Sequence, residues 1–299
     1  MEIKYPPPIE YRLMTLFDVA AGMMLKEANG WNQLEADWLR FLKFRPQGCF
    51  VAEVEGNVVG TVASVAYGNR CGWIGLMLVD AQFRRRGIGR QLMELAIESL
   101  QDCDTIKLDA TPAGRGLYET LGFREEYSLL RLVCPALPVV DLPPVALPPF
   151  CKTALLNAAE LSSLAMWNEE VFGADRGELL QDWLAESPSW AVGVKEESGQ
   201  WLGFRLSRAG AIYRQIGPVL AVNQATAQAL LVSALSETSF VESPEPLLID
   251  IPCHTPSWSD FLKTLGFEVQ RPLLRMVRGP NRTPGLVSHQ WAIGGPEWG

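Results

Sequence analysis

The same series of sequence segments occurs twice in this chain of 299 residues. Each series has an alternating apolar pair of runs around a glycine turn, then a short apolar run ending in aspartate, then Thr-Leu-Gly-Phe. The matching segments are 50–62 with 190–204, 105–109 with 247–250, and 120–123 with 264–267. Their offset stays at about 140 to 144 residues. Such a repeat predicts two copies of one fold.

A proline-rich segment separates the two copies. Six prolines lie between Cys134 and Phe150, and this composition favours an extended, semi-rigid connector. The length of the chain, with 48% apolar residues, also suits about two domains. We therefore predict an N-terminal domain at 1–134, a linker at 135–149 and a C-terminal domain at 150–299.

The overall composition argues against several kinds of partner. The net charge of −8 and the isoelectric point near 5.0 disfavour nucleic acid or an anionic membrane. The six cysteines form no Cys-x-x-Cys pair, and two histidines are too few for a histidine-rich metal site. No apolar run reaches membrane-spanning length, and the first residues do not resemble a signal peptide. We expect a cytoplasmic monomer or homodimer with reduced thiols and no metal.

One segment of the first copy carries a distinct chemistry. The apolar run that ends at Val79 is followed by Arg84–Arg86, Gly87 and Gly89, which open onto a helical pattern at 91–100. Glycine lets a backbone approach a ligand closely, and the N–H groups of a first helical turn attract phosphate. Arginine adds forked donors that match phosphate oxygens. The segment predicts a cradle for a diphosphate group; a solvated basic loop is the plainer alternative.

The cradle differs from two phosphate motifs and is similar to a third. It has neither Gly-x-Gly-x-x-Gly with a downstream acid nor Gly-Lys-Ser/Thr. The spacing Arg84-x-x-Gly87-x-Gly89 resembles the signature of the GCN5-related N-acetyltransferases (GNAT), in which this turn holds the pyrophosphate of coenzyme A. The resemblance implies acetyl-CoA as co-substrate. It implies these cofactor-binding residues: Leu78, Val79, Arg84, Arg85, Arg86, Gly87, Ile88, Gly89, Arg90 and Thr111.

A second segment, about thirty residues later, adds to the resemblance. Leu117–Gly122 reads as a short helix that a glycine ends, and Phe123 returns to the core. The segment resembles a GNAT motif whose tyrosine lies beside the acetyl-CoA sulfur and acts as general acid. Tyr118 takes that role by position, with a half-buried packing tyrosine as the alternative. Many members carry asparagine and alanine where this chain has Thr111 and Gly114, so some cofactor contacts should differ.

The second copy lacks these residues. Its corresponding turn, Val222–Thr226, holds neither arginine nor glycine, and Leu262 stands opposite Tyr118. This half and the closing segment Trp291–Glu297 resemble the C-terminal domain of bacterial tandem GNAT proteins. The resemblance implies an α/β fold of two GNAT-like domains, each a mostly antiparallel mixed sheet flanked by helices. We expect one cofactor site per chain, with the degenerate domain as a wall beside it.

The acceptor site is expected near the N-terminus. The pattern predicts a helix at 18–28 and a second helix that ends at Phe44 and begins with the capping box Asn32-x-x-Glu35. In the superfamily this region forms one wall of the acceptor site. Trp31 and Asn32 are therefore candidate acceptor contacts, although an N-cap role explains Asn32 equally well.

A general base must take a proton from the acceptor ammonium. Asp109 is the first candidate, and Glu27, beside the expected acceptor contacts, is the second; a structural carboxylate or an ordered water is the alternative. We expect an enzyme that moves an acetyl group from acetyl-CoA to the amine of a small molecule. The alternatives are a CoA-binding regulatory or sensor protein without turnover, and an acetyltransferase of protein side chains.

Overall fold

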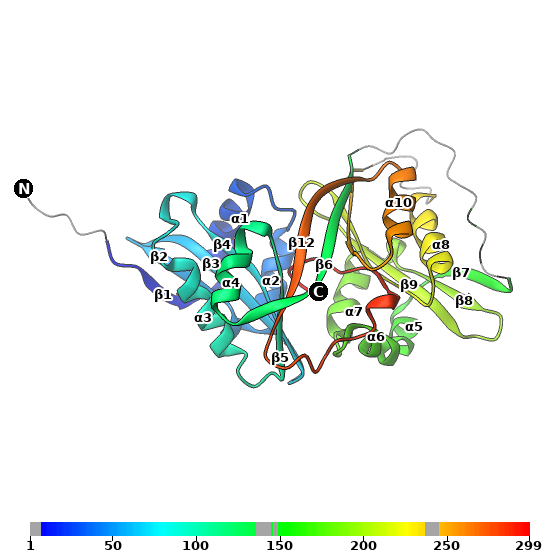
Figure 1. The fold of residues 1–299 in the computed structure, drawn as a ribbon, viewed down its shortest axis with the longest axis horizontal. Helices are drawn as coiled ribbons and strands as arrows, with labels where there is room; N and C mark the ends of the chain where they lie inside the picture. Colours follow the sequence, from blue (N-terminus) through cyan, green and yellow to red (C-terminus); the bar gives the residue numbers. More distant parts are fainter. Residues whose placement is uncertain (1–6, 136–144, 146, 148, 237–244) are drawn as a thin grey trace, which may run out of the picture.

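Two halves of similar build lie along the long axis of the molecule, with the C-terminus between them (Figure 1). The computed structural model describes residues 7–135, 145, 147, 149–236 and 245–299, so most of the predicted linker lies outside the described residues. The first half contains β1 (Glu10–Leu13), α1 (Val19–Ala28), α2 (Glu35–Phe44), β2 (Phe50–Val54), β3 (Asn57–Tyr67), β4 (Cys71–Val79), α3 (Ile88–Ser99), β5 (Thr105–Ala110), α4 (Pro112–Thr120) and β6 (Phe123–Cys134).

The second half repeats this order with one added helix, since three helices follow its first strand instead of two, and with one added strand at its end. It contains β7 (Cys151–Leu155), α5 (Ala158–Ser163), α6 (Ala165–Phe172), α7 (Gly177–Glu186), β8 (Val192–Glu196), β9 (Trp201–Arg208), β10 (Arg214–Ala221), α8 (Gln224–Leu235), β11 (Leu247–Pro252), α10 (Pro256–Thr264), β12 (Glu268–Arg278) and β13 (Gln290–Ala292). Among the described strands, only the pairs β4–β5 and β10–β11 are parallel. The predicted α/β fold, with mostly antiparallel mixed sheets flanked by helices, is confirmed.

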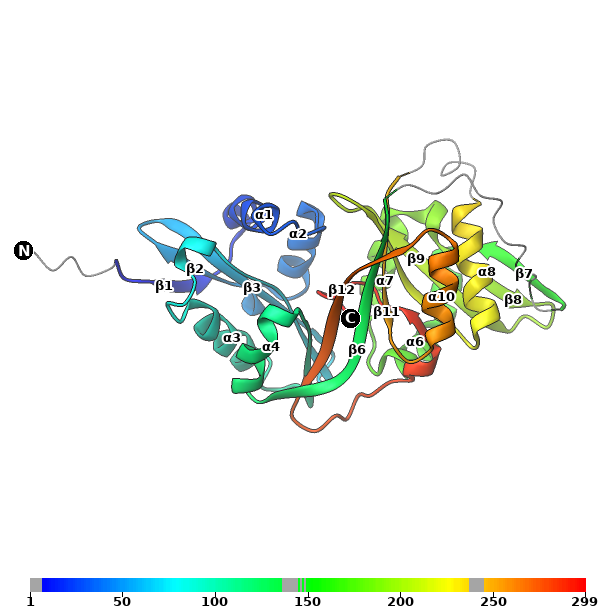
Figure 2. The same ribbon diagram turned by 45° about the horizontal axis from the view of Figure 1, so that its top comes forward.

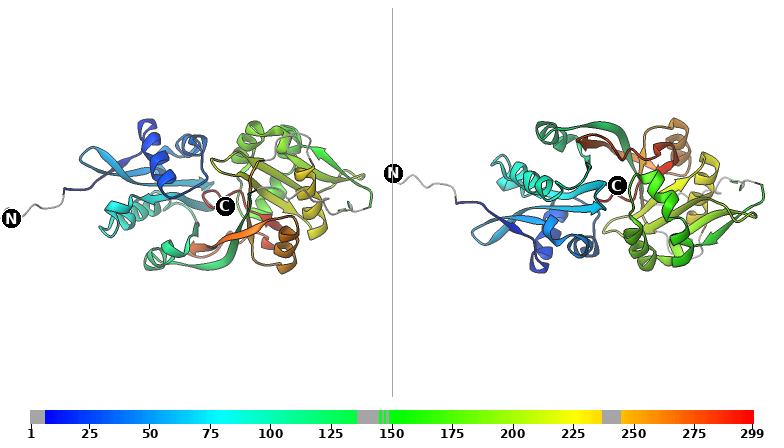
Figure 3. Two further views of the ribbon diagram at one scale, coloured as in Figure 1. Left: turned by 90° about the horizontal axis from the view of Figure 1, so that it is seen from above. Right: turned by 90° about the horizontal axis from the view of Figure 1, so that it is seen from below.

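Helices cover both faces of the strands in the first half. α3 packs on one face of β2, β3 and β4, while α1 and α2 pack on the other face of β3 (Figure 3). Two separate apolar clusters result, one holding Trp38 and Phe41 of α2 and the other holding Leu92 and Met93 of α3. In the described part of the chain, no helix is both long and apolar enough to cross a membrane.

The two halves exchange their last strands. The order across the sheet is β1-β2-β3-β4-β5-β12-β6-β11-β10-β9-β8-β7, with β13 paired to β10. The strand β12 therefore lies against β5 of the first half, and β6 lies against β11 of the second (Figure 2). The sequence did not predict this exchange, since two separate sheets satisfy the repeat equally well. The domain boundaries taken from the sequence remain a prediction.

Two matching buried ion pairs join the exchanged strands to their neighbours. The guanidinium of Arg275 on β12 donates to both oxygens of Asp109 on β5, at 2.8 Å each. The guanidinium of Arg131 on β6 likewise donates to both oxygens of Asp250 on β11, at 2.8 and 2.9 Å. Because each pair links strands of opposite halves, the pairs fix the register of the exchange.

The strands β4 and β5 pair over only three residues each, with Cys71–Trp73 of β4 opposite Thr105–Lys107 of β5. Past that point the pairing of β3 with β4 is interrupted near Thr61, and Leu76 takes a φ of +50°. The Thr61 hydroxyl donates to the Leu76 carbonyl at 2.9 Å and holds this irregularity. An irregularity of this kind bends a strand away from its neighbour. It leaves an opening between the C-terminal parts of β4 and β5.

Two predicted helix starts are wrong. The helix α2 begins at Glu35, and the carboxylate of Asp37 accepts a hydrogen bond from the Leu34 N–H at 2.9 Å, so Asn32 is not its N-cap. The helix α4 begins at Pro112 rather than near Leu117. Proline suits the first helical position because its fixed φ matches the helix and its missing N–H is not needed there.

Candidate active site

A cavity of about 610 Å³ lies at the opening between β4 and β5. Its wall combines both strands, the N-terminal part of α4, the loop before α2, part of β12 and the C-terminal segment. Seven residues predicted from the sequence line it: Trp31, Leu78, Val79, Arg84, Asp109, Thr111 and Tyr118. The other predicted residues, all within the described chain, do not: Glu27, Asn32, Arg85, Arg86, Gly87, Ile88, Gly89 and Arg90.

The basic turn stands at the N-terminus of α3, next to the cavity. Gly87 has a φ of +83° at the N-cap position and offers no side chain to the first helical turn. A Cβ at Gly89 would lie 3.1 Å from the Met77 side chain on β4, which shows how closely helix and strand approach. Arg84 is tied to the cavity wall, because it donates to the Asn29 side chain at 2.9 Å and to the Val79 carbonyl at 3.2 Å.

The remaining arginines of the turn differ in the partners that they have. Arg86 donates to the Pro7 carbonyl at 3.0 Å, and Arg90 donates to the Thr120 hydroxyl at 2.8 Å. Arg85 is exposed at a φ of +62° and has no hydrogen bond or ion pair within the described chain. The turn therefore presents free N–H groups and an unpaired guanidinium beside the cavity, which only Arg84 of the turn lines.

Tyr118 lies on α4 with its ring against Phe123, at 6.2 Å between centroids. Burial raises the pKa of its phenol to about 12, so the group is protonated at neutral pH. Within the described chain the hydroxyl has no hydrogen-bond partner. A Cβ at Gly114 would lie 2.9 Å from Cε2 of this ring. The glycine at 114, a departure from the usual alanine, therefore gives the tyrosine ring more room.

Asp109, the predicted base, is fully buried and engaged by Arg275 through both of its oxygens. Burial raises the pKa of this carboxyl, while Arg275 opposes that shift. The matching pair of Asp250 with Arg131 occurs in the half without a basic turn. The arrangement thus has a structural explanation that applies equally to both halves. A role for Asp109 as base remains a prediction.

Asn32 joins the two halves instead of lining the cavity. Its side-chain oxygen accepts hydrogen bonds from the N–H groups of Ile212 and Tyr213, at 3.0 and 2.9 Å. Its side-chain nitrogen donates to the Tyr213 carbonyl at 2.9 Å. Glu27 is exposed on α1. Of the predicted acceptor contacts, the structure brings only Trp31 to the cavity.

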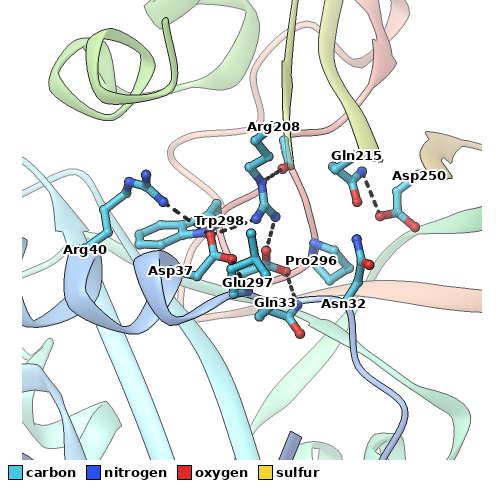
Figure 4. Close-up of polar contacts among 12 residues, drawn as sticks. Asn32, Gln33, Asp37, Arg40, Arg208, Gln215, Asp250, Pro296, Glu297 and Trp298 are labelled. Atoms are coloured by element: carbon cyan, nitrogen blue, oxygen red, sulfur yellow. Dashed lines mark hydrogen bonds and ion pairs between the residues drawn. The ribbon is translucent and has the colours of Figure 1, made fainter. Parts of the chain in front are cut away.

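The C-terminal segment contributes a carboxylate that the sequence did not point to. Glu297 lines the cavity and is 3% exposed; Gln33 donates to its carboxylate at 2.9 Å (Figure 4). The guanidinium of Arg208 on β9 donates to Glu297 as well, and its other terminal nitrogen donates to the Asp37 carboxylate at 2.7 Å. Burial raises the pKa of Glu297, and Arg208 partly offsets that shift. Gln33 and Glu297 are 264 residues apart, so no local pattern could join them.

The same C-terminal segment fills the corresponding opening of the second half. The strand β13 pairs with β10 and lies beside β11, where β4 and β5 leave the cavity in the first half. Trp291 donates from its indole N–H to the Ala221 carbonyl at 2.9 Å, and the Ile293 N–H donates to the Asp250 carbonyl at 2.9 Å. The chain itself thus occupies the position between β10 and β11.

Comparisons with known proteins agree with this architecture. A family model described as "Acetyltransferase (GNAT) family" matches residues 16–123, and one described as "Acetyltransferase (GNAT) domain" matches residues 165–292. The uncharacterized N-acetyltransferase YitH of Bacillus subtilis is 27% identical over 241 residues, which span 80% of each chain.

Two solved structures share the whole fold. A crystal structure from Pyrococcus horikoshii superposes with a TM-score of 0.77 at 23% identity and covers 100% of this chain and 99% of its own. A tandem GNAT protein from the clavulanic acid biosynthesis pathway has a TM-score of 0.64 at 16% identity and covers 92% of this chain and 100% of its own. With both family models matching separate halves, the chain belongs to the GNAT acetyltransferase superfamily as a tandem protein of two GNAT domains.

Proposed function

We propose that this acetyltransferase moves an acetyl group from acetyl-CoA to the amine of a small-molecule acceptor, at the cavity of the first half. The observation that carries the proposal is that the basic turn and the free Tyr118 hydroxyl both adjoin one cavity. The second half has neither feature, and its own C-terminal strand lies in the matching position. A cavity walled by both halves suits a small acceptor better than a protein side chain.

The residues of the first half fit the parts of coenzyme A. The uncapped N–H groups of α3 and the side chains of Arg84, Arg85 and Arg86 suit a diphosphate. Leu78 and Val79, where β4 leaves β5, line the cavity where a pantetheine arm would lie, and Thr111 lines it as well. Acetyl-CoA would supply the activated thioester.

Two protein groups would move protons in the transfer. The acceptor nitrogen forms the new amide bond as the thioester C–S bond breaks, and Tyr118 gives its phenolic proton to the departing thiolate. The proton of the acceptor nitrogen passes to a carboxylate, directly or through water. Both carboxylates accept hydrogen bonds at both oxygens, but a neutral amide, Gln33, holds one oxygen of Glu297, whereas a guanidinium holds both oxygens of Asp109; we therefore favour Glu297. Glu297 also has a pKa that burial raises, which makes it a stronger base than an exposed carboxylate.

Release of free thiol from acetyl-CoA in the presence of an amine panel tests the proposed activity. The Tyr118→Phe variant should lose roughly tenfold to hundredfold in rate while still binding CoA. Tyr213→Phe is a matched control, since Tyr213 meets Asn32 through its backbone alone. An unchanged rate in Tyr118→Phe would remove this tyrosine from the mechanism.

Replacement of both Arg85 and Arg86 by alanine tests the cradle. The double variant should bind CoA more weakly by about tenfold or more, because charge-assisted bonds to phosphate are lost. Arg70→Ala is the control, as its exposed side chain pairs with Glu169 away from the turn. Tight CoA binding by the wild-type protein without thiol release from any amine would favour the sensor alternative.

A further inference from the structure

Two residues of the cavity wall have a buried polar atom with no hydrogen-bond partner. Among the described residues that line the cavity, these atoms are Oε1 of Gln33 and Nε of Arg271. One is an acceptor and the other is a donor. Unpaired buried polar groups are costly, and at a ligand site they indicate which groups a ligand supplies.

The orientation of the Gln33 amide is fixed by its neighbour. Its Nε2 donates to the Glu297 carboxylate at 2.9 Å, since a carboxylate cannot donate to an amide oxygen in its ionised form. The Oε1 atom therefore faces away from that carboxylate and lacks a donor. An amine or ammonium group in the cavity would supply that N–H, with the Glu297 carboxylate close by.

Arg271 carries a positive charge that forms no ion pair with any residue of the described chain. It stands opposite Arg131 in the β12–β6 register, and Arg131 occupies both oxygens of Asp250. Gln215 also donates to Asp250, at 3.3 Å. Arg271 itself has no ion pair within the described residues. Burial lowers the pKa of Arg271 and the charge of Arg131 lowers it further, while the carboxylate of Asp250 opposes both effects. Like charges on directly opposed strand positions are unfavourable, and Asp250, the anion beside them, is already engaged by Arg131 and Gln215.

The register of β12 places Arg271 beyond the end of β5. Leu274 pairs with Ala110, the last residue of β5, so Arg271 lies further toward the start of α4. This position adjoins the acceptor side of the cavity, where Leu273 and Glu297 also line the wall. The basic turn for coenzyme A lies at the N-terminus of α3, on a different element.

We propose that the acceptor is an amine that also carries a carboxylate group. The carboxylate pairs with the Arg271 guanidinium, and the amine nitrogen faces Gln33 and Glu297. This inference rests on the proposed acetyltransferase function and names the substrate class of that site. One ligand then satisfies both unpaired wall atoms, and its two opposite charges match the guanidinium of Arg271 and the carboxylate of Glu297.

Matched pairs of amines with and without a carboxylate test the proposal. Suitable pairs are β-alanine with ethylamine, lysine with cadaverine, and phenylalanine with phenethylamine, each measured by thiol release from acetyl-CoA. For the best pair, the carboxylate member should have a kcat/KM at least about tenfold higher. In Arg271→Gln this ratio should fall to near one, mainly through KM, and Arg271→Lys should restore part of it.

Two further variants separate the roles within the wall. Gln33→Met should raise KM for both members of a pair alike, because it removes the amine contact and leaves Arg271. Arg278→Gln, on an exposed position of the same strand, should leave the ratio unchanged. CoA affinity, measured by calorimetry, should be the same in wild type and Arg271→Gln.

Three results would overturn the inference. One is equal kcat/KM for the two members of every pair that is acetylated, and another is a ratio that survives Arg271→Gln. A loss of CoA affinity in Arg271→Gln would also overturn it, because the guanidinium would then serve the cofactor. Thiol release from no amine at all, with CoA bound, would instead refute the proposed function and the inference that rests on it.

Discussion

The opening between β4 and β5 and the opening between β10 and β11 are formed in the same way, but only the first remains a cavity. Each follows a short parallel pairing and a strand irregularity near a matching glycine, Gly75 or Gly217. In the second half the C-terminal strand β13 lies in the opening, whereas the first half keeps a cavity whose wall the chain end only completes. The fold therefore provides the space twice, and one short segment decides which space remains for a ligand.

The helices that follow the two strands also differ at their first turn. In α8, the Asn223 side chain accepts a hydrogen bond from the Thr226 N–H at 2.9 Å, so the helix caps itself. In α3 the N-cap is Gly87, which has no side chain to offer. The first-turn N–H groups of α3 thus remain for an outside acceptor. The cap residue is thus one of the differences between the two helix starts, beside the arginines that only the first half has.

The largest expected effects come from the two ion pairs of the exchanged strands. Asp109→Asn and Asp250→Asn should each lower the free energy of unfolding by about 3–5 kcal/mol, because each leaves a buried guanidinium without its carboxylate. Chemical denaturation measures both. If Asp109→Asn abolishes turnover in fully folded protein while Asp250→Asn does not, the two pairs are not equivalent, and the result supports Asp109 as the base.

The matching glycines give the next effect. A Cβ at Gly217 would collide with the Ile293 carbonyl, and at Gly75 it would lie 2.8 Å from the Glu297 carbonyl. Gly217→Ala should therefore cost about 1–3 kcal/mol of stability and disturb the strand β13. Gly75→Ala should cost less stability and should lower the acetylation rate by moving Glu297. Equal rates in wild type and Gly75→Ala would show that the position of Glu297 does not matter.

A smaller effect is expected around Tyr118, which the second half replaces by Leu262. Gly114→Ala should lower the rate by about twofold to tenfold, because the added methyl presses on the phenol ring. Gly116→Ala on the same helix is the matched control, since a Cβ there meets nothing within 4 Å. It should keep the rate and raise helix stability slightly. A similar rate in both variants would show that the ring has room to shift.

The smallest effect is expected for Trp291→Ala, which should leave the number of CoA molecules bound per chain unchanged. Calorimetric titration should find one CoA per chain, and Trp291→Ala should leave that number at one. Removing the indole opens space beside β10 but adds no uncapped helix turn and no arginine. A second CoA per chain in Trp291→Ala would show that the C-terminal strand alone, and not the basic turn, prevents the second half from binding CoA.

Local sequence patterns predicted much of the fold and part of the site. The strand β5 and the glycine turns of the hairpins follow from alternation and turn residues, and the position of the basic turn before α3 follows from the spacing of Arg84, Gly87 and Gly89; its role as a cradle stays a prediction. The strand exchange, by contrast, depends on pairing between residues far apart in the chain. Asn32 shows most clearly what local patterns miss. Asparagine is a residue type that often caps a helix, but here the side-chain amide forms hydrogen bonds with a loop about 180 residues away.

The path of the C-terminal segment has a consequence for how such a chain evolves. A descendant that lost its second copy would lose β12 from the sheet, Arg275 from its pair with Asp109, and Glu297 from the cavity wall. The first half therefore depends on the second for a strand of its sheet, for the partner of a buried carboxylate and for part of its cavity wall. The two halves have to be kept or lost together, even though only one of them has the basic turn.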